Sequence, residues 1–524
     1  MANLVSQVAS VVEAGPDRTA IGYEGREITY GEFWAQVGRF AAALDERGIG
    51  ADDRVAIYLP NLPQFLVAFH GTLRAGGVVV PMNPQYKARE IGHLLSDSGA
   101  KAVVALSDLV PFVDEVKEGT DVAEVVSVGD SAEGATPFEG FLAGDELDVV
   151  DRADDDDAVQ PYTSGTTGQP KGVQLTHENL ASNAEASASV VPGGIGADDK
   201  QLGVLPLFHI YGMTVTMNAT LFDGGAFYPL PSWDAGEATS LIAEEELTLM
   251  HGVPAMYNDV INQPDAEEFD LSSLRLAGVG GSGIPIEVLR RFEELYDVTV
   301  CEGYGLTETA PVTHFNSPND RRVGSIGRTL PGIESRIVTD GFEDVPPVER
   351  GPVDEGEVDL DEITGEVVIA GPNVMKGYYG LPEANEAAFT EESGRKWFHT
   401  GDVGYHDEDG FYYVVDREKH MIVTGGYNVY PREVEELLFE HEDVADAAVV
   451  GIPDERRGET VKAYVVPTPD AEVDPEGIKE YCLSNLAEYK HPREVEFVEE
   501  LPRTTTGKVQ KFKLREGEEE VEAE

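Results

Sequence analysis

The sequence predicts an α/β protein in which layered α/β subdomains are followed by a small β-barrel and an α+β C-terminal domain. Apolar runs at Arg54–Leu59, Gly77–Pro81 and Ala102–Leu106 alternate with helical stretches, which favours largely parallel sheets. From about residue 324 to 415 the segments become short, β-rich and interrupted by Gly and Pro, which predicts the barrel-like subdomain. The length of 524 residues exceeds a single hydrophobic core, so at least two domains are expected.

Individual elements follow from local patterns. Residues 28–46 have apolar side chains at helical spacing after Thr29, so a capped amphipathic helix is expected there. The acidic stretch 339–364, interrupted by Pro and Gly, is interpreted as a solvated loop or a variable insertion. A domain boundary is expected near 416–420. Beyond it, Pro431 should open a helix with Val434, Leu437 and Leu438 on one face, followed by a strand at 447–450. The tail 516–524 is predicted to be disordered.

The charge balance is unusual. There are 98 Asp and Glu against 38 Lys and Arg, a net charge of −60 that is spread along the chain rather than confined to its tail. Such a field opposes binding to nucleic acid and to anionic lipid. We interpret the charge as adaptation to high salt, where self-repulsion is screened; the alternative is an ordinary acidic cytosolic protein.

Cysteine use and hydropathy restrict the location of the protein. Only Cys301 and Cys482 are present, far apart, so a disulfide scaffold and a structural zinc site are not expected. The N-terminus lacks the basic and apolar regions of a signal peptide, and no apolar run is long enough to span a membrane. A cytoplasmic location is therefore predicted. The oligomeric state stays open, with a homodimer among the possibilities.

Residues 162–172, Tyr-Thr-Ser-Gly-Thr-Thr-Gly-Gln-Pro-Lys-Gly, form the most informative segment. Its glycines permit close backbone approach to an anion, its hydroxyl residues can donate hydrogen bonds, and Lys171 adds a positive charge. The segment is therefore interpreted as a phosphate-binding loop; it is not a Walker A loop, and the alternative is a mobile Ser/Gly loop. The candidate phosphate ligands in it are Thr163, Ser164, Gly165, Thr166, Thr167, Gly168 and Lys171.

This segment resembles the signature loop of the acyl-adenylate-forming superfamily, which includes acyl-CoA synthetases, peptide-synthetase adenylation domains and luciferases. Other motifs of the superfamily follow in order, so the resemblance covers nearly the whole chain. It implies a large N-terminal domain over 1–415 that binds AMP and the acyl group, and a mobile C-terminal domain over 416–524. Because the C-terminal domain is expected to rotate between two half-reactions, its hinge is placed by the resemblance at Lys419.

The motifs of the resemblance imply further site residues. Residues 205–212, Leu-Pro-Leu-Phe-His-Ile-Tyr-Gly, are similar to the acyl-pocket segment. His209 stands there in place of the Asp that amino-acid-activating relatives use to bind an ammonium group, so the acid should lack that group. The Gly-rich loop 278–285, with Gly281 and Ser282, would flank adenine and the acyl chain. In residues 303–309, Tyr304 would stack on adenine, Gly305 is a further cofactor-binding residue, Thr307 would bind the α-phosphate, and Glu308 would hold Mg²⁺.

The remaining motifs lie towards the C-terminus. Asp402 of the Thr-Gly-Asp motif would accept the ribose hydroxyls, and Arg417 would reach the ribose or the phosphate. Lys508, in Pro-Arg-Thr-Thr-Thr-Gly-Lys, would bridge the carboxylate and the α-phosphate. Gly425 and Gly426 would face the pantetheine of coenzyme A, and Thr163 is a second candidate ligand to Mg²⁺. Two positions differ from the usual sequence pattern of the family. Val423 replaces a residue that is often polar or basic, and Met213 replaces the gating tryptophan of some long-chain enzymes.

The expected reaction joins a carboxylic acid to coenzyme A at the expense of ATP. A fatty acid of medium or long chain is favoured, with residues 212–218 as an apolar, Met-adapted wall of the acyl pocket. The alternatives are an aryl-CoA ligase of the coumarate or benzoate kind and an adenylation enzyme that loads a carrier protein. A catalytically silent acyl-binding protein is a further alternative, which the presence of Glu308, Asp402 and Lys508 opposes.

Overall fold

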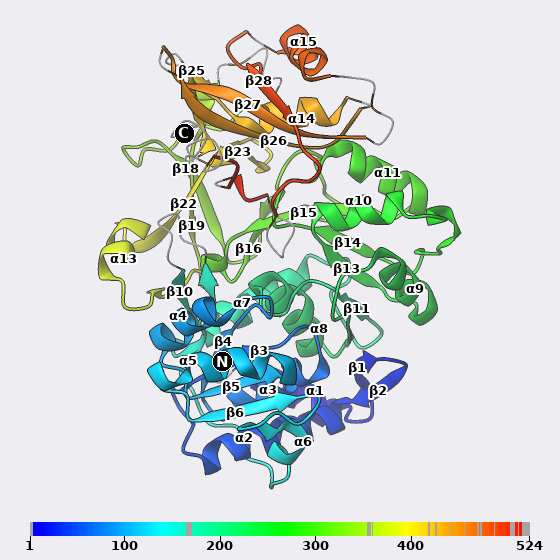
Figure 1. Ribbon diagram of the computed structural model, residues 1–524, viewed down its shortest axis with the longest axis vertical. Helices are drawn as coiled ribbons and strands as arrows, with labels where there is room; N and C mark the ends of the chain where they lie inside the picture. The colour runs from blue at the N-terminus through cyan, green and yellow to red at the C-terminus, as the bar shows by residue number, and fades with distance from the viewer. Residues whose placement is uncertain are drawn as a thin grey trace.

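The protein is an α/β molecule with a small unit seated on a large one (Figure 1). The computed structural model describes residues 4–163, 170–353, 358, 360–417, 420–424, 427–441, 443–454, 456–468, 471, 474–486, 488–503, 509–511 and 513–515. The predicted disordered tail and nine candidate site residues lie outside these ranges. Those site residues are Ser164, Gly165, Thr166, Thr167, Gly168, Lys419, Gly425, Gly426 and Lys508.

The first sheet has a parallel centre with antiparallel edges. Its described strands run in the order β17-β16-β15-β14-β13-β11-β12-β1-β2, and the ladder from β1 through β15 is parallel except for the β1–β2 hairpin. The strands are β1 (Thr19–Tyr23), β2 (Arg26–Thr29), β11 (Lys200–Gly203), β12 (Ala226–Pro229), β13 (Leu249–Gly252), β14 (Leu276–Val279), β15 (Val300–Gly305), β16 (Val312–Phe315) and β17 (Arg328–Thr329).

The second sheet contains the three apolar runs that the sequence singled out. These runs form β3, β4 and β5, and β3 pairs in parallel with both neighbours, as predicted. The order is β20-β10-β8-β4-β3-β5-β6-β7, with β9 paired to β10. The strands are β3 (Arg54–Tyr58), β4 (Val78–Pro81), β5 (Ala102–Leu106), β6 (Glu124–Val128), β7 (Thr136–Pro137), β8 (Asp157–Val159), β9 (Tyr162–Thr163), β10 (Lys171–Thr176) and β20 (Gly377–Tyr378).

Most helices connect and cover these two sheets, and the last two pack against the sheet of the C-terminal unit. The helices are α1 (Ser6–Ala14), α2 (Tyr30–Glu46), α3 (Pro63–Arg74), α4 (Ala88–Ser98), α5 (Val110–Val116), α6 (Phe138–Phe141), α7 (His177–Ser189), α8 (Ala219–Phe222), α9 (Ala235–Glu245), α10 (Pro254–Asn262), α11 (Ile286–Tyr296), α12 (Leu360–Ile363), α13 (Pro382–Ala388), α14 (Pro431–Phe439) and α15 (Pro475–Asn485). The predicted capped helix is confirmed in α2, where Thr29 and Glu32 form a reciprocal capping box. Among the described helices, none combines the length and apolarity that a membrane span requires.

The β-rich texture predicted over about 324–415 is confirmed. The strands are β18 (Glu334–Val338), β19 (Gly365–Ala370), β21 (Phe389–Glu392), β22 (Arg395–His406) and β23 (Tyr412–Arg417). The long strand β22 pairs with β19 along one edge and with β21 and then β23 along the other. The acidic stretch 339–364 is less solvated than expected, because Val345 and Leu360 are buried and pack into two apolar clusters.

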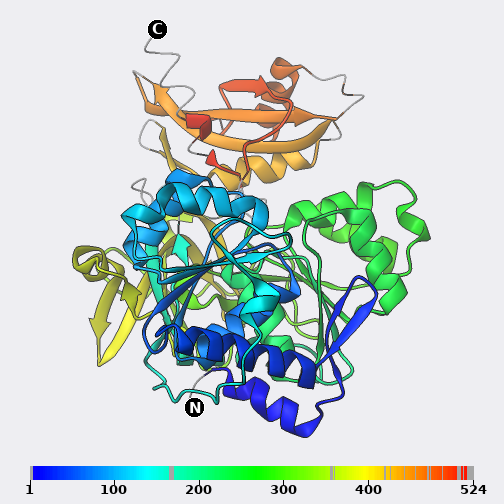
Figure 2. The same ribbon diagram turned by 60° about the horizontal axis from the view of Figure 1, so that its bottom comes forward.

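The C-terminal unit has its own sheet and core. Its strands are β24 (Ile422–Thr424), β25 (Tyr427–Val429), β26 (Val444–Asp454), β27 (Gly458–Pro467) and β28 (Glu494–Phe497). The predicted helix is α14, with Val434 and Leu438 buried and Leu437 partly buried against the same core, and the predicted strand lies within β26. Figure 2 shows this unit, in orange and red, on one side of the large domain. A separate C-terminal domain is thus confirmed.

Candidate active site

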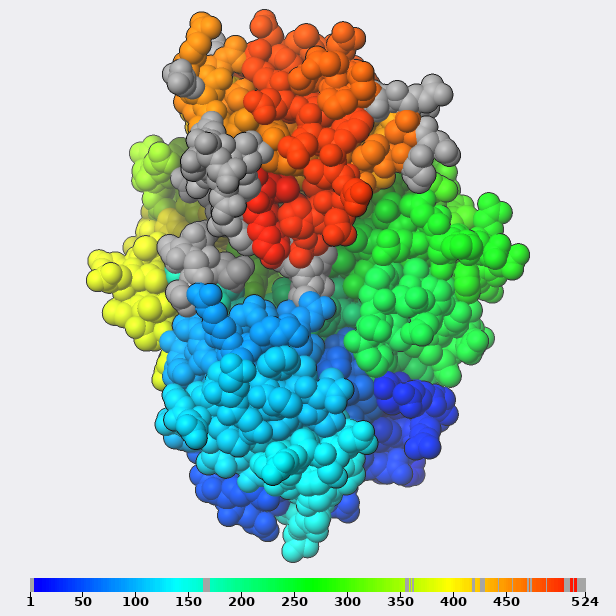
Figure 3. Space-filling model, viewed as in Figure 1, coloured from blue at the N-terminus to red at the C-terminus, as the bar shows by residue number. Residues whose placement is uncertain are grey.

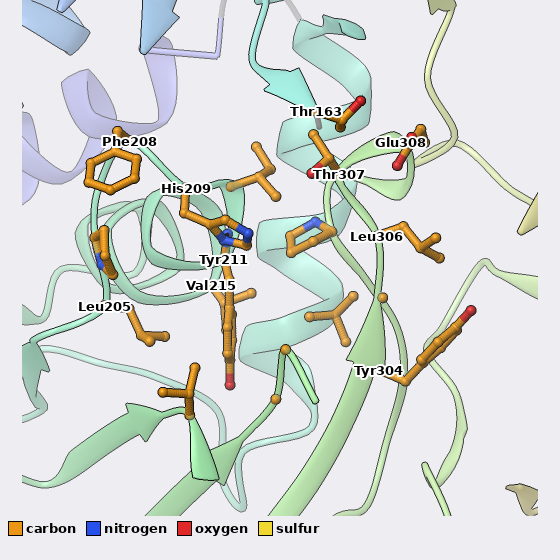
Figure 4. Close-up of a pocket in the computed structure, with 18 of the residues that line it drawn as sticks. Thr163, Leu205, Phe208, His209, Tyr211, Val215, Tyr304, Leu306, Thr307 and Glu308 are labelled. Atoms are coloured by element: carbon orange, nitrogen blue, oxygen red, sulfur yellow. Dashed lines mark hydrogen bonds between the residues drawn. The ribbon is translucent and has the colours of Figure 1, made fainter. Parts of the chain in front are cut away.

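A cavity of about 830 Å³ lies where the two large sheets and the C-terminal domain meet. Its lining comes from segments far apart in the sequence, including β9, β10, the turn after β15, and residues 503, 509–511 and 513. Figure 3 shows the C-terminal domain seated across the junction of the blue and green parts of the large domain. The cavity has a polar end and an apolar end, which Figure 4 shows with His209 between them.

The polar end is built by pairing of the two strands that flank the predicted phosphate-binding loop 162–172. Lys171 of β10 lies opposite Thr163 of β9 in an antiparallel pair, so the two ends of that loop meet at the cavity. Thr307 and Glu308 follow β15 and reach the same place, and Figure 4 shows both beside Thr163. The backbone carbonyl of Glu308 accepts a hydrogen bond of 2.8 Å from the amide of Met375, which fixes this turn. The four predicted residues therefore converge.

The side of the cavity that is predicted to bind the nucleotide is lined by glycines that allow tight packing. A Cβ atom at Gly305 would lie 2.0 Å from the carbonyl oxygen of Pro311, so a larger residue would displace the strand. Tyr304 and Gly305 line the cavity, and so does Gly281, whose φ of +85° turns the chain. Ser282 was expected here, but it is exposed and is not among the residues that line the cavity.

Asp402 lies next to the predicted adenine-stacking residue. Its carboxylate Oδ2 accepts a hydrogen bond of 2.5 Å from the hydroxyl of Tyr304, and the side chain is buried. Asp402 is also the direct cross-strand partner of Arg417 in the antiparallel β22–β23 pair, so the two predicted ribose ligands are neighbours across the strands. The cavity lining includes the neighbouring Thr400 but not Asp402, so in this conformation the carboxylate binds Tyr304 rather than lining the cavity wall.

The apolar end follows from the segment Leu205–Tyr211 and a π-helix over Tyr211–Asn218. Its lining includes Leu205, Phe208, Ile210, Tyr211, Val215 and Val253. Of the predicted wall over residues 212–218, Val215 lines the cavity, but the contribution of methionine is wrong. Met213 and Met217 are fully buried in an apolar core cluster, away from the described lining. Because Tyr211 and Val215 share one face of the helix, side chains two residues away point to another face.

The apolar end carries polar side chains but no charge. The Tyr211 hydroxyl lies 3.2 Å from Nδ1 of His251, and both residues line the cavity. Burial lowers the pKa of His251 to about 4 and raises that of Tyr211, so both are neutral near pH 7. His209 lines the cavity too, with its Nδ1 3.2 Å from the amide of Tyr211. An α-ammonium group would find no counter-charge among these side chains.

The C-terminal domain closes one side of the cavity. Arg503 and Val509 form an isolated antiparallel bridge, and both line the cavity. Arg432 of α14 covers the Gly-rich loop 278–285 with its guanidinium group. A Cβ atom at Gly283 in this loop would lie 2.7 Å from Nη2 of Arg432. Arg432 was not predicted from the sequence, because no motif connects it with that loop.

A magnesium ion bound here would take most of its oxygen ligands from the substrate and from water rather than from the protein. Among the described residues, no group of three or more His, Cys, Asp or Glu side chains could hold a metal ion. Glu308 supplies one carboxylate, and Thr163 and Thr307 supply hydroxyl oxygens at the same end of the cavity. This oxygen-only set fits Mg²⁺, which usually takes one or two carboxylates together with phosphate oxygens and water.

Comparison with known proteins agrees with the family resemblance found in the sequence. Residues 8–379 match the family model for AMP-binding enzymes, and residues 433–508 match the model for their C-terminal domain. This chain belongs to the AMP-binding enzyme family. The predicted class, an AMP-forming acyl-CoA synthetase, is confirmed by curated relatives of this family. A long-chain-fatty-acid–CoA ligase of Bacillus subtilis is 36% identical, with 96% of this chain and 92% of the relative covered.

Two more members of the family bear on the site. A feruloyl-CoA synthase of an Amycolatopsis species is 35% identical, with 95% of this chain and 96% of the relative covered. The crystal structure of ATP-bound MatB from Rhodopseudomonas palustris superposes with a TM-score of 0.88 at 31% identity, with 99% of each chain covered. The AMP-binding fold therefore spans the whole described chain, whereas the relatives act on acids of different kinds.

Proposed function

We propose that this enzyme activates a medium- or long-chain fatty acid with ATP and transfers the acyl group to coenzyme A. The observation that carries the proposal is a cavity whose apolar end adjoins Thr163, Lys171, Thr307 and Glu308. The similarity to a long-chain-fatty-acid–CoA ligase supports the choice of acid.

The chemistry requires the charges that converge at the polar end. A carboxylate is a poor acyl donor, so its oxygen attacks the α-phosphorus of ATP, and acyl-AMP forms as pyrophosphate leaves. Two anions must meet in this step, and Lys171 with Lys508 would offset their repulsion while Thr163 and Thr307 donate hydrogen bonds. Mg²⁺ held by Glu308, with Thr163, would neutralise phosphate charge when bound. The thiol of coenzyme A then attacks the mixed anhydride, AMP leaves, and the thioester forms.

An aryl acid is the second candidate substrate, and the Tyr211–His251 pair favours it. A neutral hydroxyl–imidazole pair at an otherwise apolar end offers hydrogen bonds that an alkyl chain does not use. The similarity to a feruloyl-CoA synthase agrees with this candidate. Both candidates share the reaction and differ only in the acid.

A competitive panel of short, medium and long straight-chain acids and of aryl acids would separate the candidates. The measurement is CoA-dependent release of AMP. In the variant Val215→Phe the larger ring should fill the apolar end and shift the preference to shorter acids. Met213→Leu, which changes the core rather than the cavity, is the matched control. A preference that is the same in both variants would contradict the assignment of the acyl end.

Several predictions from the sequence concern the same function. Four of them belong to the proposal and stay predictions: the cytoplasmic location, a homodimer, the hinge at Lys419, and the contact of Gly425 and Gly426 with pantetheine. Adaptation to high salt stays a prediction as well, and its test is given in the Discussion.

A further inference from the structure

Tyr378 lies on β20, a short strand beside the predicted phosphate-binding loop 162–172. The two segments are about two hundred residues apart in the sequence. Tyr378 pairs with Val173 of β10, and the amide of Tyr379 donates a 2.8 Å hydrogen bond to the carbonyl of Gly172. The backbone of Tyr378 is also held by Asn385, whose Oδ1 accepts from its amide at 2.6 Å and whose Nδ2 donates to its carbonyl at 2.9 Å. The backbone at Tyr378 is thus anchored from two sides.

The side chain of Tyr378 contacts two residues of the proposed site. Its hydroxyl donates a 3.0 Å hydrogen bond to Oε1 of Glu308. On its face, the ring holds Nζ of Lys171 at 4.9 Å from the ring centre, within the range of a cation–π interaction.

We propose that Tyr378 is a positioning residue that holds the carboxylate of Glu308 and the ammonium of Lys171 in the geometry needed to bind ATP with its metal ion. The inference rests on the proposed function, in which Glu308 carries Mg²⁺ and Lys171 faces phosphate. One oxygen of Glu308 is occupied by the phenol, which orients the carboxylate. Lys171 has a flexible stem, and the ring restricts its ammonium to one side of the cavity.

The hydroxyl and the ring can be tested separately. Tyr378→Phe removes the hydrogen bond to Glu308 and keeps the ring under Lys171, whereas Tyr378→Leu removes both. Tyr379→Phe is the matched control, because that neighbouring ring packs against Arg54 instead. Thermal melting of each variant separates a loss of folding from a loss of positioning.

The first readout is binding of Mn²⁺, a spectroscopic substitute for Mg²⁺, in the presence of a non-hydrolysable ATP analogue, followed by electron paramagnetic resonance. Tyr378→Phe should raise the half-saturating Mn²⁺ concentration about tenfold, the size typical for loss of a group that orients a metal ligand. Tyr378→Leu should weaken binding of the analogue by a further factor of about five, as expected for loss of a cation–π contact. Tyr379→Phe should match the unmodified enzyme.

The second readout is acid-dependent exchange of pyrophosphate into ATP. Tyr378→Phe should lower kcat about tenfold and leave the KM for the acid unchanged, because the hydroxyl is remote from the acyl end. Combined with Glu308→Ala, Tyr378→Phe should add no further loss in either readout, since its hydroxyl would have no carboxylate to orient. Additive losses in that double variant, or unchanged Mn²⁺ binding in Tyr378→Phe, would overturn the proposal.

The two readouts also separate this inference from the proposed function. Binding of Mn²⁺ with the analogue requires no acid and no coenzyme A, so it tests Tyr378 even if the acid is misidentified. If the unmodified enzyme binds the metal–nucleotide complex but exchanges pyrophosphate with none of the acids, the proposed function fails and the role of Tyr378 is still decided.

Discussion

Glu302 is a buried carboxyl at the boundary between the two domains, directly before the Gly-Tyr-Gly segment of the site. It is 6% exposed, and its pKa is raised to about 7, mainly by burial. Arg432 of α14 acts in the opposite direction, Glu436 adds to the rise, and the amide of Ile284 stabilises the carboxylate. Arg432 itself also interacts with Glu436 and Asp416.

This environment makes the free energy of unfolding depend on pH. Because the folded protein holds the pKa above the ordinary value of 4.5, the folded state binds the proton more tightly than the unfolded chain. The contribution of Glu302 is therefore complete below about pH 4.5 and is lost as the pH rises through about 7. At 1.36 kcal/mol per pKa unit, the loss amounts to about 3 kcal/mol.

The variant Glu302→Gln should remove this pH dependence, because the amide does not ionise. Thermal melting at constant salt should give a difference in Tm, variant minus unmodified enzyme, that grows by several degrees between about pH 5 and 8. Arg432→Met provides the opposite control: without the guanidinium the pKa of Glu302 should rise further, so the loss of stability should move to higher pH. A Tm difference for Glu302→Gln that is constant across this range would refute the reasoning.

Three further predictions concern catalysis and salt. Lys508→Ala should abolish acid-dependent pyrophosphate exchange and still convert supplied acyl-AMP to acyl-CoA; a folded variant that has lost both half-reactions would exclude a role confined to adenylation. Lys419→Pro should restrict rotation at the hinge, so adenylate formation should survive while thioester formation collapses; equal losses would place the hinge elsewhere. Thermal stability and activity should be highest above about 1 M KCl, where the Debye length is ~3 Å and self-repulsion at −60 is screened; a melting midpoint that stays flat or falls between about 0.1 and 2 M would reject adaptation to salt.

Local sequence was sufficient for the elements whose signal lies within one turn or one strand. Thr29 and Glu32 stand three residues apart, which is all that a capping box requires, and α2 begins there. The apolar runs of β3, β4 and β5 are short, continuous and separated by helical stretches, so a buried parallel sheet follows from their composition. The order of the motifs along the chain also determined the family, since each motif needs only its own residues to be recognised.

Tertiary structure decided what depends on contacts between distant segments. The composition of residues 212–218 suggested a wall of methionines, but the orientation of the π-helix turns Met213 and Met217 into the core and leaves Val215 at the cavity. Tyr378 reaches Glu308 and Lys171 only because β20 pairs with β10, and Arg432 reaches the Gly-rich loop only because α14 docks there. A sequence pattern specifies which face of an element is apolar. The partner of that face is chosen by packing of the whole chain, because long-range contacts form only when many elements are buried together.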